Sequence, residues 1–231
     1  SYYHQIIKAI EIIDIASQQV GQDNQSLAGR VKIGLLPSTY IHIQPVLFRF
    51  QDTYPNVCLD IRTITNGLDD LLAQGLDIAF HSGALGNINL VAKHLLSIER
   101  ILVASEGYLE RNSMPNSIDE LARHETICFR WPTGVVEDSW ALDNVTFSVS
   151  PHLIGDSIGF IKSATIAGRG ISYLPKIMIQ DELDNGCLIE VLPGSKPPAE
   201  DGWLLYPPRQ TLNNASRALI DWIVERADEL I

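Results

Sequence analysis

The sequence predicts an α/β protein of two similar lobes with largely parallel sheets. Short apolar segments alternate along the 231 residues with segments of helical spacing, and small or polar residues that cap helices lie between them. Repeated strands and helices require crossover connections, which make neighbouring strands parallel and cover the sheet with helices. This order begins afresh near residue 125, and the length exceeds the roughly 150 residues of a typical domain, so we expect two lobes.

The first lobe is predicted from alternating strand and helix patterns that start near residue 30. Pro37 ends the first apolar run, Pro45 suits the first turn of a helix, and Asn66 is a favoured helix cap. We expect strands over residues 30–36, 57–64 and 77–80, and helices over residues 43–54 and 68–72.

The second lobe follows two further apolar segments, at residues 90–95 and 100–105. Its helices are expected to start near Ser117, Ser157 and Pro175. Its strands are expected over residues 125–129, 145–149, 152–154, 171–174 and 188–192, and a strand over residues 203–206 and a helix over residues 216–230 complete the chain. The predicted subdomains are residues 29–99 with 205–231, and residues 100–204, with a cleft between them.

Ahead of these lobes, residues 1–21 predict one long helix that Gly21 ends. Its apolar residues, among them Ile6, Ile10 and Ile13, recur at steps of three and four, the spacing of a helix that packs against a partner helix. An amphipathic helix folded onto its own domain has the same spacing, so both arrangements stay open. We expect a linker helix through which two copies dimerise.

Composition excludes several classes of function. The net charge is −11 and no basic run occurs, so we expect no nucleic-acid binding by this segment, because that would need Lys and Arg against phosphates. No apolar run reaches the roughly 20 residues that span a bilayer, and no secretory leader opens the sequence, so we expect a soluble, cytoplasmic protein. Three separated cysteines and the lack of ligand-spaced histidines predict no metal and no cofactor.

Residues 155–159 (GDSIG) match the GxSxG motif between a predicted strand and a predicted helix, which is the setting of a hydrolase nucleophile. In that fold the catalytic histidine follows the serine, yet all six histidines precede Ser157. Ser157 is also a suitable helix cap. We therefore expect no catalytic residues and no enzyme activity, and a serine hydrolase using Ser157 stays the less favoured alternative.

Several polar residues follow predicted parallel strands and head predicted helices, whose free N–H groups favour anions. Each is equally suited to simple capping. Arg130, in the loop after the strand that ends in ICF, is the charge expected to hold a carboxylate with two hydrogen bonds. These residues predict a site for a small organic molecule, with a carboxylate as one candidate. The capping residues are Ser38, Thr39, Thr65, Asn66 and Ser157.

The order of these segments resembles the effector-binding domain of LysR-type transcriptional regulators. The strand in GRVKIGLLPS is followed by LFRFQDTYPNVCLDI, by TNGLDDLLAQGLDIAF and, late in the chain, by DSIGFIKSATIAGRGISYLPKIM. The pairing of QGLDIAF with AGRGISYLP at this separation carries most of the resemblance. It implies a fold like that of type II periplasmic binding proteins, with two Rossmann-like subdomains and an effector held between them.

The resemblance also implies ligand-contacting positions and partners. Ser38 and Thr39 after the first strand, Thr65, and His81 and Ser82 just past the third strand match places that touch the inducer in similar regulators. It implies a homodimer or homotetramer that binds DNA through a winged helix-turn-helix, which this sequence does not contain. We therefore predict a sensing domain whose conformation shifts when a small molecule binds. A solute-binding protein of the same fold that serves transport is the alternative from another class.

Overall fold

The computed structural model describes residues 27–37, 39–86, 89–143, 145–195 and 198–230. The predicted helix over residues 1–21, with Ile6, Ile10 and Ile13, lies outside these ranges, as does Ser38. The chain forms two compact units. One contains the described residues up to His81, Leu85–Leu95 and the chain from Trp203 onward, and the other contains Ser82–Ala84 and Leu96–Gly202. No helix in the described part is both long and apolar enough to cross a membrane.

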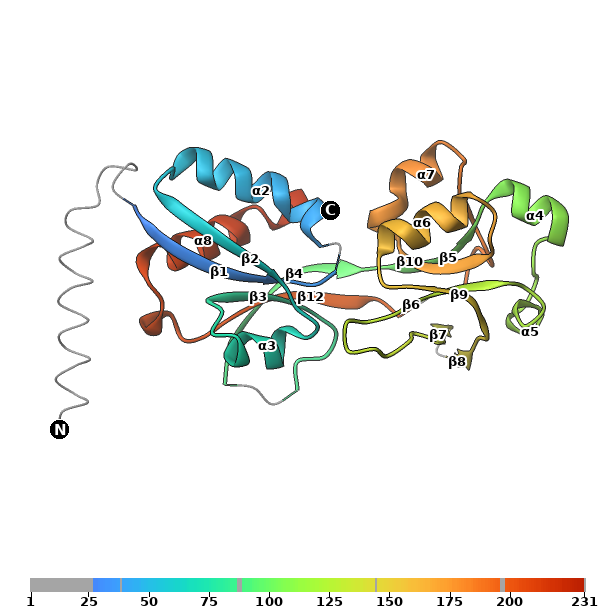
Figure 1. Ribbon diagram of the computed structural model, residues 1–231, viewed down its shortest axis with the longest axis horizontal. Helices are drawn as coiled ribbons and strands as arrows, with labels where there is room; N and C mark the ends of the chain where they lie inside the picture. The colour runs from blue at the N-terminus through green and yellow to red at the C-terminus, as the bar shows by residue number, and fades with distance from the viewer. Residues whose placement is uncertain (1–26, 38, 87–88, 144, 196–197, 231) are drawn as a thin grey trace. The chain divides into compact units, whose positions relative to one another are not determined.

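The first sheet draws its strands from both ends of the described chain. Its elements are β1 (Gly29–Leu35), α2 (Tyr40–Thr53), β2 (Val57–Thr63), α3 (Gly67–Ala73), β3 (Ile78–Ser82), β4 (Val91–Ile98), β12 (Glu200–Tyr206) and α8 (Asn214–Glu225). The strand order is β2-β1-β3-β12-β4, and β1 pairs in parallel with both β2 and β3. Figure 1 shows α2 and α8 on one face of this sheet and α3 on the other.

The second sheet has the strand order β11-β5-β10-β6-β9, with a separate β7-β8 hairpin. Its strands are β5 (Arg100–Ala104), β6 (Thr126–Phe129), β7 (Ser139–Leu142), β8 (Val145–Ser148), β9 (Pro151–Gly155), β10 (Ile171–Pro175) and β11 (Ile189–Glu190). Its helices are α4 (Glu106–Asn112), α5 (Ile118–Leu121), α6 (Ile158–Ile166), the 3-10 turn η2 (Lys176–Ile179) and α7 (Gln180–Asp184). Two short 3-10 turns, η3 (Arg209–Thr211) and η4 (Ala227–Leu230), flank α8.

The prediction of largely parallel sheets is corrected in this second sheet, which is mixed. β6 pairs in parallel with β9 and β10, but β5 runs antiparallel to both β10 and β11. A crossover helix makes parallel only the strands that it joins within one sheet, whereas β5 enters this sheet directly from β4 of the other sheet, with only Glu99 between them.

Both faces of the second sheet are buried, which explains the continuous apolar sequence of β5 (RILVA). On one face, Leu102 packs in a core with Trp140 and Tyr173. On the other face, Ile101 packs in a core with residues of β6 and α6. The β7-β8 hairpin supplies Trp140, whose side chain is 1% exposed. The hairpin therefore closes the face that α6 does not cover (Figure 1).

The sequence did not predict α4 and β7, because both elements are short. α4 buries only Tyr108 and Leu109, too few apolar positions to show a helical period, and β7 has four residues. The helix expected after Pro175 is divided into η2 and α7, and β11 covers two residues of the strand expected over residues 188–192.

Candidate functional site

The carboxyl ends of β1, β2 and β3 meet at one edge of the first sheet because the three strands are parallel. Just past β2, Ile64 N donates to the carbonyl of Leu35, the last residue of β1, at 3.0 Å. Four of the residues predicted to contact an effector lie at or just past these strand ends within the first unit: Thr39, Thr65, Asn66 and His81. Ser82, the last residue of β3, is assigned to the second unit.

The turn between β2 and α3 is built around the carboxylate of Asp70. Its Oδ2 accepts hydrogen bonds from Thr65 N at 2.8 Å, Thr65 Oγ1 at 3.0 Å and Asn66 N at 3.1 Å. Burial acts to raise the pKa of Asp70, but these bonds and one from Gln74 outweigh it and hold the pKa below its ordinary value. Because the Thr65 hydroxyl donates to Asp70, its oxygen lone pairs remain to accept a hydrogen bond from a ligand.

Asn66 caps α3 as the sequence indicates, since its Oδ1 accepts from Leu68 N at 2.9 Å. The start of α3 also packs tightly on the end of β3. A Cβ atom built at Gly67 would lie 2.6 Å from Phe80 O and 2.9 Å from His81 Cβ, so only glycine fits there. This close approach fixes Asn66 beside His81, which is 8% exposed.

Thr39 stands at the head of α2, but its hydroxyl does not cap the helix. The hydroxyl donates instead to Leu36 O, and Thr39 N donates to the same carbonyl at 3.1 Å. The expected side-chain cap is therefore wrong at this residue. Sequence reasoning also missed His42, one turn further on, whose Nε2 is buried without a hydrogen-bond partner in the described part of the chain. Burial lowers the pKa of His42.

Ser82, the last residue of β3, donates a hydrogen bond from Oγ to Glu200 Oε2 at 2.7 Å. Glu200 begins β12, more than a hundred residues later in the chain. No sequence signal pairs these two residues, because their contact depends on the strand order of the folded sheet. The hydroxyl of Ser82, like that of Thr65, thus has its proton engaged by a carboxylate.

Arg130 and Ser157 share the corresponding edge of the second sheet, at the carboxyl ends of β6 and β9. Arg130 N donates to Gly155 O at 2.7 Å, which joins the two strand ends. The guanidinium is exposed and makes one hydrogen bond to the described residues, from Nη1 to Gly134 O at 3.3 Å. The rings of the flanking residues Phe129 and Trp131 meet edge to face with centroids 5.2 Å apart. Phe129 is 5% exposed, and Trp131 packs against the same core, so these two rings hold the start of the loop against the second sheet.

The loop that carries Arg130 is anchored by Arg100 and Glu137, neither of which the sequence singled out. Arg100 is 9% exposed, and its Nη2 also donates to Tyr173 O at 2.9 Å. Burial opposes the charge of Arg100, but the hydrogen bond and charge of Glu137 outweigh it and raise the pKa of the guanidinium. Glu137 N donates to Phe129 O at 2.8 Å, so this loop returns to the end of β6.

Ser157 has the geometry of a helix cap. Its Oγ accepts from Phe160 N at 3.4 Å, and its side chain is exposed at the start of α6. The nearest histidine in the sequence, His152, has its Nδ1 2.7 Å from Glu125 Oε2. Within the described ranges, no three His, Cys, Asp or Glu residues gather as a metal site would require.

A family profile described as the LysR substrate binding domain matches residues 24–228. Among curated proteins, the chain is 26% identical over 194 residues to the HTH-type transcriptional regulator CrgA of Neisseria meningitidis serogroup C (strain 8013), covering 82% of this chain and 64% of that protein. It is 28% identical over 232 residues to an HTH-type transcriptional regulator of Xanthomonas campestris pv. campestris (strain 8004), covering 97% and 67%. The chain thus spans about two thirds of the length of these relatives.

Solved structures share the fold. The regulatory domain of CrgA from Neisseria meningitidis superposes with a TM-score of 0.76 at 24% identity, covering 87% of this chain and all of that one. The regulatory domain of AphB in Vibrio vulnificus superposes with a TM-score of 0.72 at 25% identity, covering 86% of this chain and 99% of that one. The family and the α/β fold of such regulatory domains, both predicted from the sequence, are confirmed.

Proposed function

Because this chain belongs to the LysR substrate-binding domain family, we propose that it senses a small organic effector on behalf of a DNA-binding transcriptional regulator. One observation carries the proposal: the polar side chains at the carboxyl edge of β1, β2 and β3 are held in fixed orientations by neighbouring groups. A preformed set of hydrogen-bonding groups at such an edge is the usual setting of ligand binding in α/β folds.

The proposed effector contacts at the carboxyl ends of these strands are Ser38, Thr39, Thr65, Asn66, His81 and Ser82. The hydroxyls of Thr65 and Ser82 donate to Asp70 and Glu200, so each can accept a hydrogen bond. An effector with N–H or O–H donors therefore suits this edge.

Arg130 and Ser157 are proposed effector contacts at the edge of the second sheet. The Arg130 guanidinium keeps most of its five N–H donors available, since it makes one hydrogen bond in the described chain. Those donors match the two oxygens of a carboxylate. Trp131, the next residue in the chain, is half-buried, so the accessible part of its ring offers apolar surface in the same loop. A carboxylate with a neighbouring apolar group fits this combination.

We propose that effector binding shifts the conformation of a homo-oligomer that binds DNA through a helix-turn-helix domain. The support is that the matched curated relatives are HTH-type transcriptional regulators longer than this chain. Ile6, Ile10 and Ile13 are the proposed dimerisation residues. A cytoplasmic location follows from the same proposal, because a regulator must reach DNA.

The two alternative functions have less support. A solute-binding protein that serves transport shares the fold, but the curated proteins cited above are regulators. A hydrolase would use Ser157, whose hydroxyl accepts a bond from the first turn of α6. Relatives that regulate transcription likewise support a protein without enzyme activity.

A thermal-shift screen over small carboxylates, aromatic compounds and amino-acid derivatives tests the proposal, because a ligand that binds the folded form raises the unfolding midpoint. For a carboxylate hit, Arg130→Ala should weaken binding about tenfold or more, the loss expected when a charge-assisted hydrogen bond is removed. Arg123→Ala, an exposed arginine elsewhere in the same unit, is the matched control. Equal affinity of the two variants would remove Arg130 from the site.

A further inference from the structure

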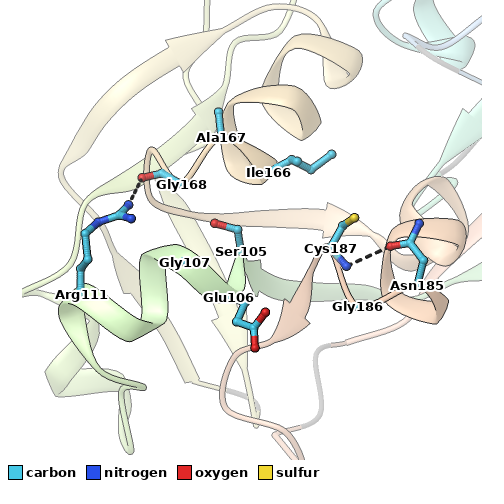
Figure 2. Close-up of a pocket in the computed structure, with 10 residues that line it drawn as sticks. All are labelled: Ser105, Glu106, Gly107, Arg111, Ile166, Ala167, Gly168, Asn185, Gly186 and Cys187. Atoms are coloured by element: carbon cyan, nitrogen blue, oxygen red, sulfur yellow. Dashed lines mark hydrogen bonds between the residues drawn. The ribbon is translucent and has the colours of Figure 1, made fainter.

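A pocket lies at the opposite edge of the second sheet. It has a volume of about 470 Å³ and is formed where β5 ends, where α6 gives way to β10 and where α7 turns toward β11 (Figure 2). β5 carries Arg100 at one end and is followed by Ser105 at the other. Five residues of a strand span roughly 13 Å, so this pocket is separate from the edge that carries Arg130 and Ser157.

The guanidinium of Arg111 in the last turn of α4 and the hydroxyl of Ser105 at the head of that helix both lie near Gly168 on one side of this pocket. Arg111 Nη2 donates to Gly168 O at 3.3 Å, and Figure 2 shows Ser105 Oγ pointing toward the same glycine. A Cβ atom built at Gly168 would lie 2.8 Å from Arg111 Nη2 and 3.4 Å from Ser105 Oγ. The guanidinium and the hydroxyl therefore lie within reach of one ligand group beside Gly168.

The hydroxyl of Ser105 has no use within the described fold. The residue is 6% exposed, yet Oγ makes no hydrogen bond to any described residue and does not cap α4. Its oxygen borders the pocket and is therefore available to donate a hydrogen bond to a ligand there or to accept one. This serine is therefore the strongest sign that the pocket is a binding site.

The pocket also holds two opposite charges that do not pair with each other. Arg111 and Glu106 both line it, and neither has an ion-pair partner among the described residues. They stand five positions apart on α4, whereas side chains pair along a helix at three or four positions. A ligand with an anionic group near Arg111 and a cationic group near Glu106 neutralises both.

We propose that this pocket binds a small zwitterion of the α-amino-acid type. Its carboxylate accepts hydrogen bonds from Arg111 and from Ser105 Oγ, while its ammonium group faces Glu106. Its side chain lies toward Ile166, Ala167 and Cys187, which line the remainder of the pocket. This site is distinct from the proposed effector site.

Cys187 provides a local readout. Cys187 is exposed and lines the pocket. Cys58 is exposed on β2 in the other unit. Cys128 is buried, and burial raises the pKa of its thiol to about 12. The rate at which iodoacetamide alkylates each cysteine is measured by mass spectrometry, with and without each of the twenty free amino acids. Cys58 is the internal control, and Cys128 should stay unreactive.

The expected result is that at least one amino acid, at about 10 mM, slows alkylation of Cys187 several-fold, as a site with a Kd of about 1 mM requires, while Cys58 reacts unchanged. The matching acid without the amine and the amino-acid amide should give little protection. Failure of all twenty amino acids, or equal protection by the acid without the amine, would overturn the proposal.

Variants separate this site from the effector site. Ser105→Ala and Arg111→Gln should abolish protection of Cys187. Thr65→Val, at the edge of the first sheet, and Arg123→Gln, an exposed arginine outside the pocket, should preserve it. Loss of protection in Thr65→Val together with unchanged protection in Ser105→Ala would show that the ligand acts from the effector site, and would contradict binding in this pocket.

Discussion

Arg100 and Glu137 form a two-armed ion pair, with Nη1 and Oε1 at 2.5 Å and Nη2 and Oε2 at 2.7 Å. The guanidinium also lies 4.3 Å from the centroid of the Tyr173 ring. The pair joins the first residue of β5 to the loop between β6 and β7. It therefore holds in place the loop on which Arg130 and Trp131 lie.

Glu137→Gln should lower the free energy of unfolding by about 3 kcal/mol, because it leaves a buried guanidinium without its counter-charge. The side chains of Arg100 and Glu137 are 11% and 20% exposed. The control is Glu99→Gln, in an ion pair with Lys176 whose side chains are 53% and 41% exposed, where about 1 kcal/mol or less is expected. Urea unfolding measures both, and equal losses would contradict the anchoring role of Glu137.

Ser157→Ala should lower the free energy of unfolding by about 1 kcal/mol through loss of the α6 cap. Ser105→Ala is the matched control. Ser105 stands at the head of α4 without a capping bond, so Ser105→Ala should change the free energy of unfolding by no more than about 0.5 kcal/mol.

An assay with a chromogenic ester should show no hydrolysis by the wild type or by Ser157→Ala. Hydrolysis by the wild type that Ser157→Ala abolishes would establish the hydrolase instead.

The unfolding midpoint should fall as the pH drops through 6.5. Burial lowers the pKa of His124 from 6.5, and its Nδ1 lies 3.2 Å from the hydroxyl of Tyr108, which accepts a hydrogen bond from Glu125 N. His124 therefore binds a proton more readily in the unfolded chain than in the folded protein. The contribution of neutral His124 to the free energy of unfolding is complete above pH 6.5 and is lost as the pH falls below it. His124→Gln should weaken this dependence in thermal melts, and an unchanged dependence would exclude His124.

Changing Ile6, Ile10 and Ile13 together to Asp should reduce the mass of the protein in solution, as measured by light scattering. Charged residues at the apolar positions of a paired helix disrupt the pairing. The control changes Glu11 and Asp14, which lie off that spacing, to Asn. An unchanged mass in the isoleucine variant would remove these residues from the dimerisation interface.

Much of the fold follows from local patterns, as the segment from β1 to β3 illustrates. There the strands, the Asn66 cap and the helix after it occur where apolar spacing and capping residues predict them. Trp140 could not be placed in this way. β7 has only four residues, and its burial depends on a core assembled from distant parts of the chain.

Some residues of the candidate sites could likewise be predicted from the sequence, and others could not. Thr65 and Asn66 are identified because one turn contains both the strand end and the helix cap. The partnerships of Ser82 with Glu200 and of Arg100 with Glu137 join residues 118 and 37 positions apart. Such contacts depend on strand order, and no spacing in the sequence encodes them. The unpartnered hydroxyl of Ser105 is likewise visible only once its neighbours are in place.

The most direct test of the proposed effector site is the affinity of Thr65→Val for the effector found by the thermal-shift screen, measured by titration calorimetry. Valine keeps the shape of threonine but removes the oxygen that faces Asp70, and Asn66 still caps α3. The Kd should rise about fivefold to tenfold, the loss of one hydrogen bond, while Thr53→Val in α2 leaves it unchanged. The same Kd for the wild type and Thr65→Val would contradict effector binding at this edge.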